Sequence, residues 1–175
     1  MKRADLIVLA ACICVFGCAQ PQTPSQSPPA LSGKQAGLAR DQWQIQPFGE
    51  SVAAVVRADN DDLLLFSCTE SVNMVAVALI PADQSALSDE QNATLAFDGG
   101  APIEPRLTAL KHSTGHVSFS VTDIEPGFRP VMEKLMSFHM LDIAIMQSDS
   151  VQSRRRFALN GAAQAIAKIA RRCGQ

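Results

Sequence analysis

Two cysteines in the body of the chain restrict how it can fold. Cys68 and Cys173 lie about a hundred residues apart, and the other three cysteines all fall within the first eighteen residues. Strand alternation in residues 63–69 places Cys68 on an apolar face, and helical spacing in residues 162–173 places Cys173 on an apolar stripe. Both side chains should therefore point at the core. In an exported chain we favour one disulfide between them over two buried free thiols.

Between these cysteines the sequence predicts a mainly β domain. Apolar and β-branched runs are bounded by turn residues, and helical spacing appears in only two places. The predicted strands cover residues 51–57, 63–69, 72–80, 93–97, 103–111, 117–122, 140–146 and 154–159. Helices are predicted at 131–138, after a bend at 126–130, and at 162–173. We expect one domain over residues 41–175, a β-sandwich-like fold of seven or eight strands with a packed C-terminal helix.

The first eighteen residues have the pattern of an export signal. Lys2 and Arg3 form a short positive region, and residues 6–16 form an apolar run too short to span a bilayer. The end of the segment resembles the lipobox of bacterial lipoproteins, in which a cysteine receives the lipid. Cys12 matches the box better residue by residue, but cleavage there leaves too few apolar residues before it. We therefore favour a signal peptide over 1–17 and lipid attachment at Cys18; the alternative is a secretory peptide cut further on.

The segment after Cys18 has the composition of a tether. Residues 19–29 contain four prolines and no charged side chain, and such a segment cannot bury enough apolar surface to fold. We predict a disordered, Pro/Gln/Ser-rich tether over residues 18–40. The lipoprotein resemblance implies two acyl chains on the cysteine, enough for lasting attachment. Ala19 is not the aspartate associated with inner-membrane retention, which implies the outer membrane. We expect the domain to face the periplasm of a bacterial envelope.

Charge and aromatic content argue against two classes of ligand. Removal of residues 1–17 leaves 15 − 2 = 13 basic and 17 − 1 = 16 acidic residues, a net charge of about −3. This balance does not indicate a nucleic-acid surface. Tyrosine is absent and Trp43 is the single tryptophan, so a carbohydrate cleft lined with aromatic rings is poorly supported. No cofactor is predicted.

Two polar clusters resemble metal sites but lack essential features. His112 and His116 have a spacing that would align two ligands on a helix, yet the Ser-Thr-Gly between them indicates a hairpin turn. The aspartates in residues 59–62 resemble the start of a calcium loop, but the glycine and the closing glutamate are missing. We predict no metal site, and we interpret the aspartates as a solvated turn.

Three consecutive arginines form the remaining candidate site. On the strand predicted for residues 154–159, alternation sends Arg155 to the opposite face from Arg154 and Arg156. Arg154 and Arg156 are therefore our candidate contacts for lipid headgroups or another anionic partner. The alternative is that these charges protect a sheet edge from pairing with another chain.

Two parts of the mature chain resemble known periplasmic proteins. These are residues 65–68, where a cysteine ends an early strand, and residues 157–173, where a strand turns at glycine into a small-residue helix with a terminal cysteine. The pattern resembles invasion-associated locus B-like proteins and the periplasmic accessory proteins encoded with type VI secretion systems. This resemblance implies a β-sandwich with a packed terminal helix and supplies no catalytic residues. The chain lacks the tryptophans often seen mid-domain in such proteins.

The sequence contains none of the common catalytic or nucleotide-binding motifs, such as a nucleophile elbow, a phosphate loop or a zincin helix. We therefore expect a non-enzymatic envelope lipoprotein that acts as a binding or secretion-accessory module, with an envelope protein as its partner. The alternative is a periplasmic inhibitor or ligand scavenger. A small hydrolase ranks third, since Ser, His and Asp residues distant in sequence can still meet in a fold.

Overall fold

The computed structural model describes residues 38–174, which form one antiparallel sheet of nine strands and two α-helices. Across the sheet the strands follow the order β1-β2-β3-β4-β7-β6-β5-β8-β9. The strands are β1 (Gln44–Phe48), β2 (Ser51–Arg57), β3 (Leu63–Thr69), β4 (Met74–Ile80), β5 (Asn92–Phe97), β6 (Ile103–Lys111), β7 (Val117–Thr122), β8 (Met140–Gln147) and β9 (Ser150–Ala158). The helices are α1 (Phe128–Ser137) and α2 (Ala162–Ala170), and the short 3₁₀ segments are η1 (Glu70–Val72) and η2 (Arg171–Cys173). The prediction of a mainly β domain with a C-terminal helix is confirmed.

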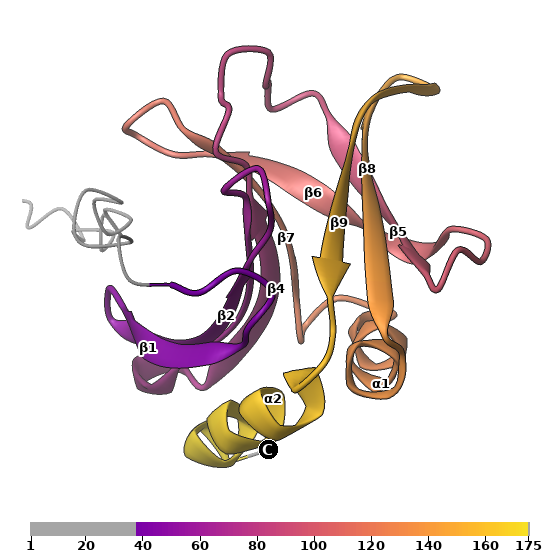
Figure 1. The fold of residues 1–175 in the computed structure, drawn as a ribbon. Helices are drawn as coiled ribbons and strands as arrows, with labels where there is room; N and C mark the ends of the chain where they lie inside the picture. Colours follow the sequence, from indigo (N-terminus) through magenta and orange to yellow (C-terminus); the bar gives the residue numbers. More distant parts are fainter. Residues whose placement is uncertain (1–37, 175) are drawn as a thin grey trace, which may run out of the picture.

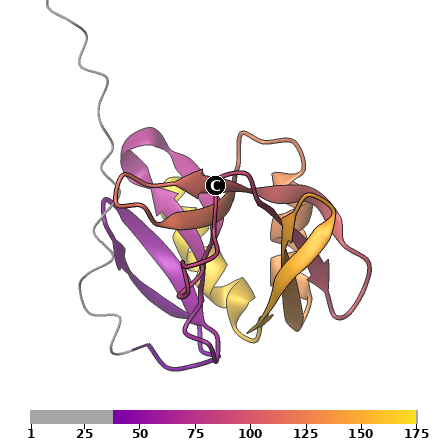
Figure 2. The same cartoon turned by 90° about the horizontal axis from the view of Figure 1, so that it is seen from above.

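The sheet curves so that its two ends face each other, as Figures 1 and 2 show. Strands β1 to β4 form the first wing, β5, β8 and β9 form the second wing, and β7 and β6 connect them. The core lies between the wings, where Leu64 and Phe66 of β3 share one buried cluster with Ile143 of β8 and Phe157 of β9. The sandwich-like packing is therefore made by a single sheet that bends back over its own core.

Strand β1 is the element that brings the count to nine, above the seven or eight predicted. Its polar Gln44 and Gln46 and its Pro47 give the segment a weak strand pattern. It becomes a strand because a tight turn lays it against β2, with Phe48 opposite Ser51. This segment is therefore a strand because it pairs with β2, and not because its own residues favour a strand.

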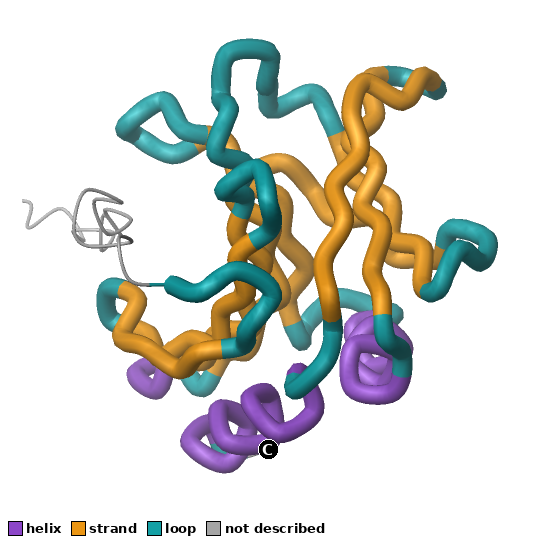
Figure 3. Tube along the Cα trace, in the orientation of Figure 1, coloured by secondary structure: helices purple, strands orange, loops and turns teal. Residues whose placement is uncertain are grey.

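Both helices lie at one end of the curved sheet, and long loops lie at the other (Figure 3). Helix α2 packs its apolar stripe, including Ile166 and Ile169, against β2 and β3. Helix α1 begins at Phe128, earlier than predicted, because Pro130 is tolerated in the first turn of a helix. Gly127 precedes it with φ 92°, and a Cβ there would lie 2.8 Å from Cδ of Pro105. None of the described helices is long and apolar enough to cross a membrane.

A second apolar cluster covers the outer face of β2 and β3. Leu38 is buried there against Val55 of β2 and Leu65 of β3. Two residues further on, the backbone of Arg40 forms an isolated parallel β-bridge with the backbone of Arg57, the last residue of β2. Residues 38–40 were predicted as the end of the tether, and in the structure they lie on the domain. The predicted signal peptide, Cys18 and the rest of the tether lie outside the described residues.

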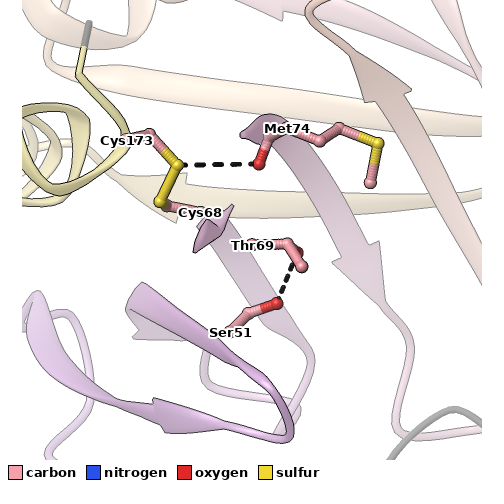
Figure 4. The surroundings of a disulfide bond; sticks show 5 residues. All are labelled: Ser51, Cys68, Thr69, Met74 and Cys173. Carbon is pink, nitrogen blue, oxygen red and sulfur yellow. Dashed lines mark hydrogen bonds between the residues drawn. A yellow bond between two sulfur atoms is a disulfide. The ribbon is translucent and has the colours of Figure 1, made fainter. Parts of the chain in front are cut away.

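The disulfide between Cys68 and Cys173 joins the end of β3 to η2, as Figure 4 shows. The two Cα atoms lie 5.9 Å apart, within the usual range for a disulfide, and both side chains are buried. Beside it, Cys173 Sγ lies 3.8 Å from the carbonyl oxygen of Met74. One residue after Cys68, the hydroxyl oxygens of Thr69 and Ser51 lie 2.6 Å apart and bind the end of β3 to the start of β2. The C-terminal helix is thereby attached to the centre of the first wing.

Candidate binding site where the sheet ends meet

The two ends of the sheet are joined by two side-chain contacts, and we call this junction the seam. The indole Nε1–H of Trp43, which precedes β1, donates a hydrogen bond of 3.2 Å to the carbonyl oxygen of Ala158 at the end of β9. Further along β9, Arg155 pairs with Asp62 in the turn between β2 and β3. The seam thus consists of Trp43, Asp62, Arg155 and Ala158, and it holds the first wing against the second.

Asp62 is the most constrained charged group at the seam. Its side chain is only 1 % exposed, and its carboxylate accepts hydrogen bonds of 2.7 Å from the backbone N–H of Ala82 and from Nδ2 of Asn60. Arg155 Nε lies against Oδ2 of Asp62 as an ion pair, but its N–H is not directed well enough to form a hydrogen bond. The prediction of a solvated turn is therefore wrong for Asp62, because the bent sheet brings an arginine over it.

The other two aspartates of this turn each face a separate arginine. Asp61 accepts a hydrogen bond of 2.8 Å from Nε of Arg57, and Asp59 lies 3.8 Å from Arg40. The carboxylates are consequently neutralised one by one and do not converge on a common point. Within residues 38–174 there is no group of three or more His, Cys, Asp or Glu side chains placed to hold a metal ion.

Arg154 and Arg156 lie on the outer face of β9, on the opposite side from Arg155. Arg156 Nε donates a hydrogen bond of 2.7 Å to Oδ1 of Asp142, its cross-strand neighbour. This hydrogen bond and the adjacent negative charge raise the pKa of Arg156 above its ordinary value. Arg154 faces Ala144 across the strand pair, and it takes part in none of the ion pairs found in the described part of the chain.

An open cleft of about 480 Å³ lies along the seam. The three consecutive arginines of β9 line it together with Asp41, Asp59 and Asn60. Because Arg155 is paired with Asp62 and Arg156 with Asp142, Arg154 is the arginine of the cleft that has no ion-pair partner among residues 38–174. The cleft therefore presents a guanidinium group beside an edge strand, and it suits an anionic group on a larger partner.

The predicted hairpin turn at the two histidines is present. The backbone N–H of His112 donates a hydrogen bond of 2.8 Å to the carbonyl oxygen of His116, which closes the turn between β6 and β7. Nε2 of His112 lies 2.8 Å from the hydroxyl oxygen of Ser118, in a pair whose donor depends on the tautomer. Burial lowers the pKa of His112, and the neighbouring His116 lowers it further. These contacts of His112 are therefore made within the β6–β7 hairpin.

A third histidine lies beside an acid, but on the open surface. Nδ1 of His139 is 3.5 Å from Oδ2 of Asp98, and the His139 side chain is 79 % exposed. Asp98 also accepts backbone hydrogen bonds from Met140, at 2.7 Å, and from His139, at 3.1 Å. These bonds lower the pKa of Asp98, the Met140 bond most of all. The carboxylate holds the start of β8 in place, and a surface pair of this kind does not form an enclosed catalytic pocket.

Sequence reasoning identified Arg154 and Arg156 but missed the ion pair that Arg155 forms with Asp62 across the seam. The signal in the sequence was that alternation places the charged Arg155 on the inward face of a strand, where a charge needs a partner. Comparison with known proteins gives no independent identification. No protein-family model matches the chain, and no curated protein is significantly similar to it.

Proposed function

We propose that this chain is an envelope lipoprotein whose folded domain acts as a non-enzymatic binding or secretion-accessory module. The observation that carries the proposal is the open cleft at the seam, which is lined by Arg154 of the edge strand β9. An open cleft with a cationic group at a sheet edge is suited to the surface of another protein. The partner is an envelope protein that presents an anionic group to Arg154.

The N-terminal part of the proposal rests on the sequence. Residues 1–17 serve as the export signal, Cys18 carries the lipid, and the following residues connect it to the domain. The stretch 18–37 contains 37 − 18 + 1 = 20 residues, which span at most about 70 Å when fully extended. The domain would therefore work close to the periplasmic surface of the outer membrane.

Photo-crosslinking in the cell tests the partner. A photoreactive amino acid replaces Asp59, an exposed residue that lines the cleft, so that Arg154 stays in place, and a matched variant carries it at Lys111, an exposed position on β6. We expect one reproducible envelope protein to be captured from position 59 and not from position 111. Failure to capture such a protein from position 59, or equal capture from both, would count against the proposal.

Lipid labelling tests the anchor. We expect a Cys18→Ala variant to lose incorporation of a labelled fatty acid, with Cys12→Ala retaining it. The labelled band is read from whole cells after detergent extraction and separation. Labelling that persists in Cys18→Ala and disappears in Cys12→Ala would move the attachment site to Cys12, and labelling of neither parent nor variants would refute the anchor.

A further inference from the structure

A second groove, of about 560 Å³, lies between β1 and α2. In Figure 1 the strand β1 lies above the helix along much of its length. Its lining includes Trp43 and Ile45 on the strand side, Ala165 and Lys168 on the helix side, and Asp41 near the start of the strand. The groove is distinct from the cleft at the seam, although Asp41 borders both.

One wall of this groove is an unpaired strand edge. β1 is the first strand of the sheet and pairs only with β2 within the described structure. Pro47 lies opposite Val52 and has no N–H, so its nitrogen must face the free edge of the sheet. Backbone groups alternate in direction along a strand, so the N–H and C=O of Ile45 face the same free edge. Ile45 therefore offers a donor and an acceptor to an added strand.

The other walls supply a shallow apolar contact. The side chain of Ile45 is 39 % exposed, although it lies on the same face of the sheet as the buried core. Ala165 presents only a methyl group from α2, so the helix leaves room beside the strand. Trp43 is held in place because its indole N–H is bonded to Ala158. Together these groups form a small apolar contact next to free backbone hydrogen-bonding groups, in a groove that Gln42, Asn160 and Gln164 also line.

Charge distinguishes the two ends of the groove. Lys168 lies in the last turn of α2, and the ion pairs found between residues 38 and 174 do not include it. Asp41 lies near the opposite end, next to Asn160 and Gly161 at the start of the helix. A ligand that complements the groove therefore carries its negative charge at the Lys168 end.

We propose that this groove binds an extended peptide segment of a partner protein, which adds to β1 as a further strand. The backbone of the peptide pairs with Ile45, one apolar side chain packs over Ile45 and Ala165, and a carboxylate meets Lys168. Addition of a strand to a free sheet edge is a common mode of peptide recognition, in which main-chain bonds provide affinity and side-chain pockets provide specificity. The inference rests on the proposed binding function and names the site and the chemistry of its ligand.

Selection from a library of random ten-residue peptides tests the groove. Trp43 is the only tryptophan of the chain and lines the groove, so its fluorescence reports binding there directly. We expect selected peptides to be rich in strand-forming residues, to carry an acidic group, and to change Trp43 fluorescence in a saturable manner. If no selected peptide changes Trp43 fluorescence, the proposal is overturned.

Variants then separate strand addition from unspecific attraction. Ile45→Pro removes an N–H that faces the free edge, so we expect the sheet to form and peptide affinity to fall at least about tenfold. Lys168→Glu lies on the exposed side of α2 and should reduce affinity about as strongly, while Lys111→Glu, on β6, should leave it unchanged. Equal affinity of the parent and Lys168→Glu would overturn the proposal even if Ile45→Pro fails to fold.

The outcome can be distinguished from that of the proposed function. If no library peptide binds the groove but the crosslinker at position 59 captures an envelope partner, the groove is refuted and the binding function stands. Groove-binding peptides without a captured partner would support the site and count against the proposed role in the envelope.

Discussion

The two wings of the sheet are covered differently. In the first wing, Ala53, Ala54, Val55 and Val56 of β2 are all buried, so that this strand has no solvent face. In the second wing, β9 buries only Phe157 fully, and its outer face is open to solvent. Unbroken apolar runs therefore mark the strands that are covered on both faces, while mixed patterns mark those that cover the core from one side.

The difference has a specific cause. The outer face of the first wing is covered by the second apolar cluster, to which Leu38 and Phe48 contribute. The outer face of the second wing instead carries the pair Arg156–Asp142 and Arg154, which has no ion-pair partner within residues 38–174. The first wing is built for packing, and the second wing leaves polar groups accessible.

The largest expected effect comes from the disulfide that attaches α2 to the first wing. Replacement of both Cys68 and Cys173 by serine opens a loop of 105 residues, for which chain-entropy models give a loss of about 4–5 kcal/mol. Urea unfolding of the periplasmically expressed domain measures this loss. The mass of the non-reduced parent provides the control, because a mass with two free thiols would contradict the disulfide itself.

Substitution of Arg155 at the seam should lower the free energy of unfolding much more than substitution of Arg156, the next residue. Arg155→Met leaves the buried carboxylate of Asp62 without its cation, and the loss of one partner from a buried pair costs about 3 kcal/mol. Arg156→Met removes a pair whose arginine is 70 % exposed, so it should change the free energy of unfolding little. Denaturant unfolding of the two variants is a matched comparison, and equal effects would mean that the seam does not hold the wings together.

The cover over the first wing should contribute measurably through Leu38. We expect Leu38→Ala to lower the free energy of unfolding by about 2 kcal/mol, because it removes apolar contacts from a buried position. Ile124→Ala, at a side chain that is 83 % exposed, serves as the control and should have almost no effect. Thermal unfolding of both variants decides the matter. An unchanged thermal stability of Leu38→Ala would show that burial of the outer face by Leu38 does not stabilise the domain.

The smallest effect should be a pH dependence from His112. Burial lowers its pKa below the ordinary 6.5, so the unfolded chain takes up the proton more readily than the folded one. Stability is therefore lost as the pH falls below about 6.5 towards the folded pKa. In His112→Gln this loss should be smaller between pH 7 and pH 5. An unchanged slope of stability against pH would refute the assignment.

Much of the fold was accessible from local sequence patterns. The alternation in β7 and the continuous apolar runs of β2 and β3 correctly predicted strands, and the stripe ending at Cys173 correctly predicted a helix. Local patterns failed for β1, which depends on its partner strand, and for the start of α1, where Pro130 resembled a bend. The first failure concerns a segment whose neighbouring strand selects its conformation, and the second reflects that proline is compatible with the first turn of a helix.

In the candidate site, the sequence predicts which way the arginines face but not which residues they meet. Alternation alone separates Arg155 from Arg154 and Arg156, because the side-chain period of a strand is a local property. That Arg155 meets Asp62, from a turn more than ninety residues earlier, depends on the curvature of the whole sheet. The same curvature brings Trp43 to Ala158.

The sequence by itself determined the class of the domain, the positions of most strands and which cysteines face the core. These follow from side-chain periodicity and from turn residues, which act over a few positions. Only the tertiary structure decided that one sheet bends back on itself, that Asp62 is a buried anchor and that β1 leaves an open edge beside α2. Those features depend on long-range pairing, whose geometry is set by the packing of all nine strands together.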